Sequence, residues 1–427
     1  MATLIKQVRI IDPRTHTDMV DDVLISSENI EIAPSNVKEG YTTINGRNRI
    51  LTPGLVDLHV HFREPGFTHK ENIASGIRAA LAGGVTSALV MPNTNPALDT
   101  PQSVLFQLKK ARTFGFDLMV AAAATKGLLG KEISDIAALK QSGAKAITDD
   151  GKPILEDSLM MNVLKACRAH KLVCMQHAEH TGISCGHALN EGKASQRLCI
   201  PGQKAQAEYD MVARDIDLAE KLEARYHVLH LSCAQSLKLV ARAKKRKALV
   251  SCEVTPHHIL LSESDIHVAD GNKKMNPPLR SKDDRDALLN GINDGVIDAV
   301  ASDHAPHHRR EKLLLFTKAP FGVVGVETSI LVLLRLVHEG KISLMRAISL
   351  MTDGPAKILQ EHERIGTLVG DRALKNAVLI DPNVVFMLNE NHMYGRSKNS
   401  AFLGMELRGR VLATFLNGEI GYQAGKI

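Results

Sequence analysis

The chain has 427 residues, 44% of them hydrophobic and 23% charged, which is enough to bury a large core within one α/β barrel. Lysine and arginine exceed aspartate and glutamate by 53 − 47 = 6. This excess is too small to indicate binding to nucleic acid, although it suits a small acidic substrate. No apolar run approaches the roughly 20 residues of a membrane span, and residues 1–9 lack the apolar region of a signal peptide. We therefore expect a protein that binds no membrane. Six cysteines without C-x-x-C spacing favour reduced thiols, which are typical of the cytoplasm.

Short β-rich segments open the chain. Residues 3–11, 22–25 and 30–32 are separated by turn-forming residues, and this pattern predicts antiparallel strands of a small sheet. After Pro53 the pattern changes, because apolar segments typical of buried strands now alternate with segments typical of helices.

Eight strands are predicted in this alternating region. They span residues 55–60, 85–90, 117–123, 144–148, 172–176, 227–231, 248–253 and 296–301. Helical segments at 71–82, 156–169, 205–224 and 282–290 are long enough to serve as crossovers. Eight βα units in about 250 residues predict an α/β fold with a (β/α)8 TIM-type barrel, whose active site would lie at the carboxyl ends of the strands.

The end of the chain returns to β-like sequence. After helical segments at 326–338 and 344–351, the residues at 377–380 and 408–417 are typical of strands. We expect them to join the first strands in a small β-sandwich domain formed by residues 1–53 and 365–427. The barrel would then occupy residues 54–364.

His59 and His61 stand at the end of the first barrel strand. Residues i and i+2 of a strand point to the same side, so the two imidazoles would project together and could bind one metal ion. A single histidine in this place would more often pack in the core or meet solvent. The His-x-His spacing, followed two residues later by Arg63, favours a metal site.

Other strand ends carry further metal-binding residue types. They are Asp150 after the fourth strand, His177 after the fifth, His230 after the sixth and Asp303 after the eighth. Four histidines and two carboxylates at one barrel mouth suit two borderline ions such as Zn²⁺. Water held by two such ions becomes hydroxide near neutral pH, which is the nucleophile needed to open an amide. The alternative for Asp149-Asp150-Gly151 is a simple turn.

Four motifs together resemble the bacterial class I dihydroorotases of the amidohydrolase superfamily. They are HVHFREPG at 59–66, MPNT at 91–94, SDHAPH at 302–307 and APFGVVGVET at 319–328. The resemblance extends from about residue 51 to residue 327, and more faintly to the end of the chain. It implies the reversible cyclisation of N-carbamoyl-L-aspartate to dihydroorotate in de novo pyrimidine biosynthesis.

The resemblance also implies a role for each site residue. The first Zn²⁺ would be held by His59, His61 and Asp303, the second by His177 and His230, with Asp150 bridging the two. Asp303 would also be the catalytic general base. The substrate would be bound by His61, Arg63, Asn93, Asn276, His307, Phe321 and Gly322, of which Arg63, Asn93 and His307 match the carboxylate-binding positions. One or two Zn²⁺ ions per subunit are implied, two being favoured, together with a homodimer and, in some members, a complex with aspartate transcarbamoylase.

Three alternatives remain open. Many relatives bridge their metals with a carboxylated lysine, and Lys145 lies near Asp150 in the sequence. The chain could also be a different cyclic-amide hydrolase of the hydantoinase or allantoinase type, but Arg63, Asn93 and His307 provide for a carboxylate that those substrates lack. A non-catalytic dihydroorotase-like partner of aspartate transcarbamoylase would be free to lose metal ligands, and none is missing here.

Overall fold

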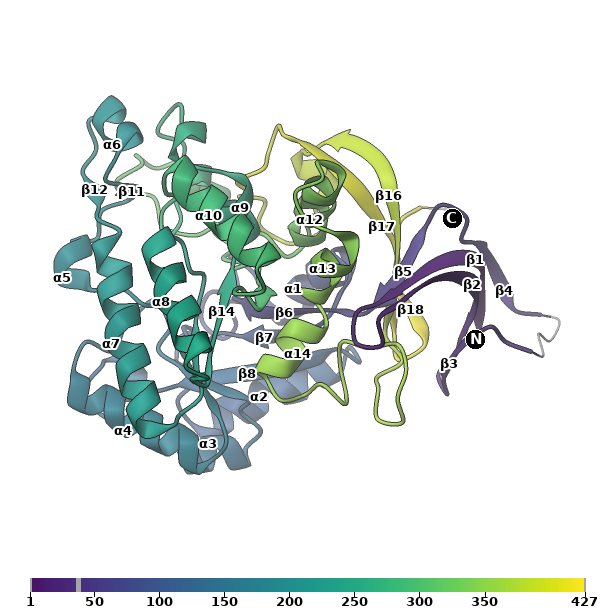
Figure 1. Ribbon diagram of the computed structural model, residues 1–427, viewed down its shortest axis with the longest axis horizontal. Coiled ribbons are helices and arrows are strands. Elements are labelled where there is room, and N and C mark those ends of the chain that lie inside the picture. The colour runs from purple at the N-terminus through teal and green to yellow at the C-terminus, as the bar shows by residue number, and fades with distance from the viewer. Residues whose placement is uncertain (1, 36–39, 426–427) are drawn as a thin grey trace.

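The apolar segments that alternate with helices form a barrel of parallel strands in the computed structural model, which describes residues 2–35 and 40–425. Helices cover the outside of the barrel, and a second sheet stands beside it (Figure 1). The predicted α/β fold with a TIM-type barrel is confirmed.

Each barrel strand overlaps a predicted segment. In hydrogen-bonding order they are β6 (Leu55–Val60), β7 (Val85–Val90), β8 (Asp117–Ala123), β9 (Ala146–Thr148), β10 (Val173–Gln176), β13 (Tyr226–Val228), β14 (Val250–Val254) and β15 (Ala299–Val300). Strand β15 is shorter than predicted, because loop residues complete the barrel between β15 and β6. The amide of Val300 donates to the carbonyl of Leu350 at 2.9 Å, and that of Val56 donates to Met351 at 2.7 Å.

The helices follow the predicted order. They include α1 (Ile73–Ala82), α2 (Pro101–Arg112), α3 (Ile136–Gln141), α4 (Asp157–Ala169), α7 (Gln206–Leu222), α8 (Ala234–Lys245), α10 (Lys282–Asn293), α12 (Ser329–His338), α13 (Leu344–Ser349) and α14 (Asp353–Ile358). Short elements in the loops are η1 (Lys126–Leu128), α5 (Thr181–Ser184), β11 (Leu189–Asn190), α6 (Lys193–Leu198), β12 (Gly202–Gln203), α9 (Pro256–Leu260), η2 (Glu263–Asp265), η3 (Gly271–Lys273), α11 (Arg309–Lys312) and η4 (Glu390–His392). Within the described residues, no helix has the length and apolar character needed to cross a membrane.

Alternation along the strands divides the apolar core into two parts. Leu89, Met119 and Met175 belong to a cluster inside the barrel that also includes residues of α14. Neighbouring strand residues such as Val90 and Val120 belong to the larger cluster beneath the helices. Because successive side chains of a strand point to opposite faces, one set of apolar side chains packs inside the barrel and the other packs beneath the helices.

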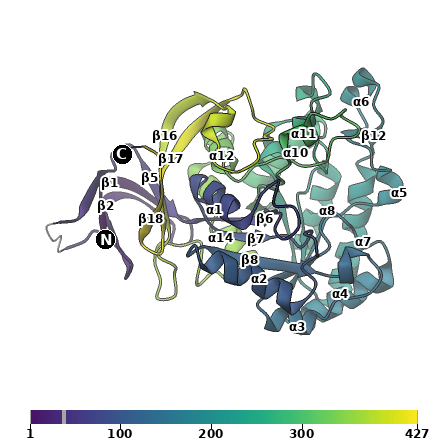
Figure 2. The same cartoon turned by 180° about the vertical axis from the view of Figure 1, so that it is seen from behind.

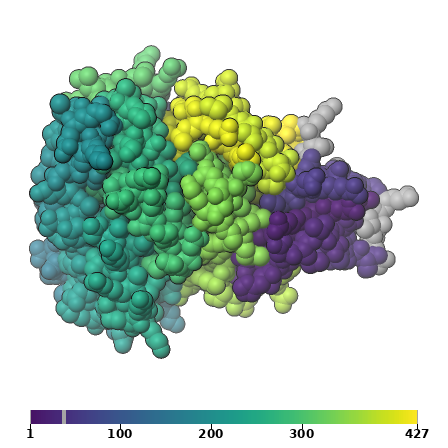
Figure 3. Space-filling view, turned by 45° about the horizontal axis from the view of Figure 1, so that its top comes forward, coloured from purple at the N-terminus to yellow at the C-terminus, as the bar shows by residue number. Residues whose placement is uncertain are grey.

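Segments from both ends of the chain share one further sheet. Its strands are β1 (Thr3–Asp12), β2 (Thr17–Ile25), β3 (Ile30–Ile32), β4 (Thr42–Asn45), β5 (Ile50–Pro53), β16 (Ala377–Met387), β17 (Glu406–Leu416) and β18 (Glu419–Gln423). The pairing of β5 with β16 joins the two ends, as the sequence predicts, and Figures 2 and 3 show these segments side by side. The segments predicted as antiparallel strands pair in that way, β1 with β2 and β2 with β3, whereas β4 and β5, which lie outside those segments, run parallel to β1. The boundaries proposed at residues 53 and 365 stay a prediction.

Candidate active site

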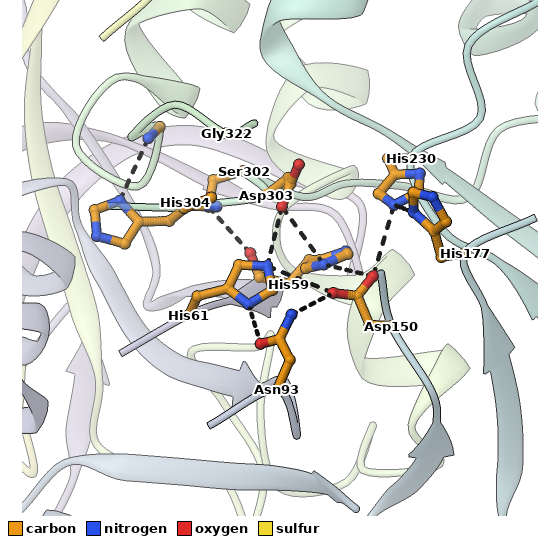
Figure 4. A network of polar contacts seen from close by, with 12 residues as sticks. His59, His61, Asn93, Asp150, His177, His230, Ser302, Asp303, His304 and Gly322 are labelled. Carbon is orange, nitrogen blue, oxygen red and sulfur yellow. Dashed lines mark hydrogen bonds and ion pairs between the residues drawn. The ribbon is translucent and has the colours of Figure 1, made fainter. Parts of the chain in front are cut away.

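The first candidate metal group consists of His59, His61 and Asp150, all buried (Figure 4). Nε2 of His59 lies 3.4 Å from Oδ1 of Asp150, and Nε2 of His61 lies 3.6 Å from its Oδ2. The two histidines are i and i+2 at the end of β6, with His59 in the strand and His61 just after it, and their ring centroids are 5.2 Å apart. Imidazole nitrogens and a carboxylate converging in this way match the ligand preference of Zn²⁺.

The second candidate group shares Asp150 with the first. Its other members are His177, after β10, and His230, after β13. Nε2 of His230 lies 3.7 Å from Oδ1 of Asp150 and 2.9 Å from Nδ1 of His177. Asp150 therefore stands between two pairs of histidines, which is the position of a bridging ligand (Figure 4).

The buried nitrogens fit a cation. Nε2 of His59 has no hydrogen-bond partner although it is buried. In His177, Nε2 lies 2.8 Å from Oε2 of Glu179, which accepts its proton and leaves the Nδ1 lone pair facing His230. A metal ion would satisfy Nε2 of His59, which lacks a partner in the protein, and could accept the lone pair of Nδ1 of His177.

Asp303 lies beside the first group. Its Oδ1 is 3.2 Å from Nε2 of His61 and 3.6 Å from Nε2 of His59. Burial raises the pKa of Asp303, but the charges of His59 and His61 and the hydrogen bond of His61 lower it by more, so the pKa lies below its ordinary value. The residue has φ of 45°, an unfavourable backbone conformation for a non-glycine residue, of the kind that clusters at functional sites.

Arg63 and His307 form a cationic corner of the site. Nη2 of Arg63 lies 3.4 Å from Nε2 of His307, and its Nε donates to the carbonyl of Pro306 at 3.2 Å. Burial lowers the pKa of Arg63 to about 10, so the guanidinium remains charged at neutral pH. Within the described residues, the hydrogen-bond partners of the Arg63 side chain are Pro306 and His307, neither of which is a carboxylate. A cation held in this way is suited to an anionic ligand.

His307 is neutral in this corner. Burial, together with the charges of Arg63, Lys70 and Lys312, lowers its pKa to about 2. Its Nε2 lies 2.8 Å from the carbonyl of Phe321, and its Nδ1 lies 3.2 Å from Nζ of Lys70. The ring therefore donates through Nε2 to Phe321 and accepts from Lys70 through Nδ1.

Two asparagines contact the candidate metal groups. Asn93 lies between His61 and Asp150, at 2.8 Å from Nδ1 of the histidine and 3.2 Å from Oδ2 of the aspartate (Figure 4). Asn276 donates to Oε2 of Glu179 at 2.8 Å, beside His177. All the sequence-predicted side chains thus gather around one mouth of the barrel.

The backbone at Phe321–Gly322 is anchored by two buried lysines. Nζ of Lys312 donates to the carbonyls of Gly322 at 2.8 Å and Pro320 at 2.9 Å. Lys274 places its Nζ 4.5 Å from the centroid of the Phe321 ring. Gly322 has φ of 117°, and a Cβ there would lie 2.6 Å from Cβ of Ala305, so only glycine fits this turn.

Lys145 lies away from these groups. It precedes β9, whereas Asp150 follows it, and its Nζ pairs with Glu361. Asp149 does not face the histidines either, because it accepts from the backbone amide of Thr125 at 3.0 Å and from its hydroxyl. Among these neighbours, only Asp150 is placed to bridge.

Several supporting residues escaped the sequence analysis. Glu253 accepts a hydrogen bond from Nδ1 of His59, and Glu179 accepts one from Nε2 of His177. Asp57 accepts from the backbone amides of His59 and Ser302 at 3.1 and 3.0 Å. A general rule could have pointed to them, because a metal-binding histidine almost always donates the N–H of its other ring nitrogen to a carboxylate or carbonyl. An acidic residue within or just after a barrel strand is therefore a candidate partner for such a histidine.

Comparisons with known proteins agree with this geometry. A family model described as dihydro-orotase-like matches residues 48–236. A dihydroorotase of Endomicrobium trichonymphae is 39% identical over 99% of this chain and 100% of its own length, and one of Carboxydothermus hydrogenoformans is 41% identical over 94% of each. Among solved structures, an L-hydantoinase (dihydropyrimidinase) from Arthrobacter aurescens has the same fold, with a TM-score of 0.87, 22% identity and coverage of 100% of this chain and 97% of that one. The chain belongs to the dihydroorotase family.

Proposed function

We propose that this protein is a zinc-dependent dihydroorotase that interconverts N-carbamoyl-L-aspartate and (S)-dihydroorotate in pyrimidine biosynthesis. The observation that carries the proposal is the shared position of Asp150, which belongs to both candidate metal groups, at a barrel mouth that also holds the buried cation of Arg63. The full-length similarity to dihydroorotases supports it.

The proposed metal ligands are His59, His61 and Asp303 for one ion, His177 and His230 for the other, and Asp150 as the bridge. When bound, Zn²⁺ would polarise the reacting carbonyl and lower the pKa of water. The choice of Zn²⁺, and of two ions over one, rests on the donor set, which has imidazole and carboxylate groups and no cysteine.

Asp303 has the position of the general base. In hydrolysis, a water oxygen bonds to the ring carbonyl carbon, and Asp303 accepts a proton from that water. The carbon–nitrogen bond then breaks, and Asp303 donates the proton to the leaving ring nitrogen. The neighbouring histidines lower the pKa of Asp303, which favours the ionised carboxylate that the first step requires.

Arg63, Asn93 and His307 are proposed to bind the substrate carboxylate. The planar guanidinium of Arg63 can form paired hydrogen bonds to it, and this orients the ring towards Asp303. Asn276 and the backbone at Phe321–Gly322 are proposed to contact the pyrimidine ring. They lie on the side of the mouth formed by the loops after β14 and β15.

Location and assembly are part of the proposal. We propose a cytoplasmic enzyme, which the six thiols support because none is paired in the described structure. A homodimer, and a complex with aspartate transcarbamoylase, are proposed from the family resemblance. Light scattering of the purified protein, alone and mixed with aspartate transcarbamoylase, tests both.

The direct experiment combines metal analysis with an assay. Purified protein should contain zinc, hydrolyse dihydroorotate and cyclise N-carbamoyl-L-aspartate. Protein stripped with a chelator should lose both activities and regain them on addition of Zn²⁺. A fully active metal-free protein, or a zinc-loaded protein inactive on both compounds, would refute the proposal.

A further inference from the structure

A column of polar side chains runs through the barrel interior behind His59. Nδ1 of His59 lies 3.1 Å from Oε1 of Glu253, and Oε2 of Glu253 lies 3.2 Å from Nε2 of His227. Nδ1 of His227 in turn lies 2.8 Å from Oγ of Ser251. His59, Glu253 and His227 are fully buried, whereas Ser251 is half-buried and lines a cavity of about 340 Å³ among residues at the amino ends of the strands.

The column follows from the strand register. Ser251 and Glu253 are i and i+2 on β14, so they share its inner face, and Ser251 is the Cα partner of His227 on β13. Bulky apolar residues usually fill these interior layers of a barrel. Burying the carboxylate of Glu253 in this layer costs free energy unless hydrogen bonds compensate it. A charged residue in an otherwise apolar layer therefore suggests a role beyond packing.

The hydrogen bonds define the state of each ring. A carboxylate only accepts, so His59 donates through Nδ1 to Oε1 of Glu253 and His227 donates through Nε2 to Oε2. In the neutral ring, which is the form that binds a metal, the second nitrogen of His59, Nε2, carries the lone pair. That atom is the one that faces Asp150 and Asp303, at 3.4 and 3.6 Å.

We propose that Glu253 is a positioning residue for metal binding, which fixes the tautomer and orientation of His59, and that His227 and Ser251 fix Glu253 in turn. This inference rests on the metal site of the proposed function. It assigns to the column a contribution to metal affinity, since residues that support a ligand histidine typically change that affinity 10–100-fold when mutated.

The test is the affinity of the metal-free protein for Zn²⁺, measured by competition with a chromophoric chelator. Glu253→Gln keeps the size of the side chain but has one acceptor oxygen, so only one of the two histidines retains its acceptor. We expect its Kd for Zn²⁺ to rise about 10–100-fold. A Kd within about twofold of wild type would overturn the inference.

Control variants separate positioning from packing. Asp215 is also a fully buried carboxylate, and it binds Arg214 and the hydroxyl of Tyr226. Asp215→Asn should lower the Tm of the metal-free protein without changing the Kd for Zn²⁺. If Asp215→Asn weakened Zn²⁺ binding as much as Glu253→Gln does, the effect would be general to buried carboxylates and the inference would fail.

Variants further along the column keep the test decisive if Glu253→Gln does not fold. His227→Gln retains a donor for Glu253 and should keep most of the Zn²⁺ affinity, whereas His227→Leu should lose it. Ser251→Ala, at the half-buried end, should weaken binding less than Glu253→Gln. Equal Kd values for His227→Gln and His227→Leu would contradict the inference, and a wild-type protein that bound no Zn²⁺ would overturn the metal site itself.

Discussion

Oδ1 of Asp303 lies 3.2 Å from Nε2 of His61, although the two residues follow the last and the first strand of the barrel. The closing hydrogen bonds explain the contact. The amide of His61 donates to the carbonyl of His304 at 2.9 Å, which joins the loop after β15 to the end of β6. Closure of the barrel therefore brings the proposed base to the proposed metal ligands.

Asp303→Asn should abolish activity in both directions. An amide can occupy the same place but cannot accept a proton from water, and the loss of a general base costs ~10²–10⁴-fold. Steady-state assays of hydrolysis and cyclisation, with zinc content measured in parallel, check this. More than about a hundredth of wild-type activity would remove Asp303 from that role.

Arg63→Ala should leave the zinc content unchanged and lower kcat/KM on dihydroorotate about 10²-fold or more, because the substrate loses both a paired ionic contact and its orientation. Arg310→Ala is the matched control, since Arg310 is an exposed arginine of the loop after β15. Wild-type kcat/KM in Arg63→Ala would mean that the assigned substrate is wrong.

Metal loading should need no carbon dioxide, because Asp150 is a permanent carboxylate whereas a carboxylated lysine is formed from bicarbonate. Stripped protein is reconstituted with Zn²⁺ in CO₂-free buffer, with and without bicarbonate, and compared with Asp150→Ala and Lys145→Ala. Asp150→Ala should lose activity, whereas Lys145→Ala should keep it. Activity that requires bicarbonate, disappears in Lys145→Ala and survives in Asp150→Ala would overturn the bridge.

Lys312→Met should have a pH-dependent effect on stability. Burial, with a smaller effect from Lys274, lowers the pKa of Lys312 to about 7, below the ~10.4 of an unfolded chain. Between these two pKa values the unfolded chain binds more protons than the folded protein, so the free energy of unfolding of the wild type rises with pH. Below pH 7 the side chain is charged in both states, and the folded protein bears the full cost of burying that charge. The Tm of Lys312→Met relative to wild type should therefore be higher at pH 6.5 than at pH 9.

Thermal unfolding at the two pH values measures this difference. Lys318→Met is the control, because Lys318 is exposed in the same loop and should show no such dependence. A relative Tm for Lys312→Met that stayed constant or rose with pH would show that the ammonium of Lys312 is not destabilised by burial.

Much of the fold is predictable from local patterns. Apolar segments bounded by turns mark the barrel strands, and the i, i+2 spacing of His59 and His61 places both rings at one strand end. The short length of β15 was not predictable, because on one side its hydrogen-bond partners are loop residues instead of another strand. The supporting residues were missed for a similar reason, since Glu253 lies 194 positions from His59 and no local pattern links the two.

The comparison of dihydroorotate with dihydrouracil tests the central claim most directly, because dihydrouracil is the same ring without the carboxylate. A site that binds the carboxylate through Arg63, Asn93 and His307 should reject the analogue that lacks it by about 10⁴-fold in kcat/KM. We therefore predict strong turnover of dihydroorotate by the zinc-loaded protein and almost none of dihydrouracil. Equal or higher kcat/KM on dihydrouracil would contradict the account and would instead indicate a hydantoinase-type enzyme.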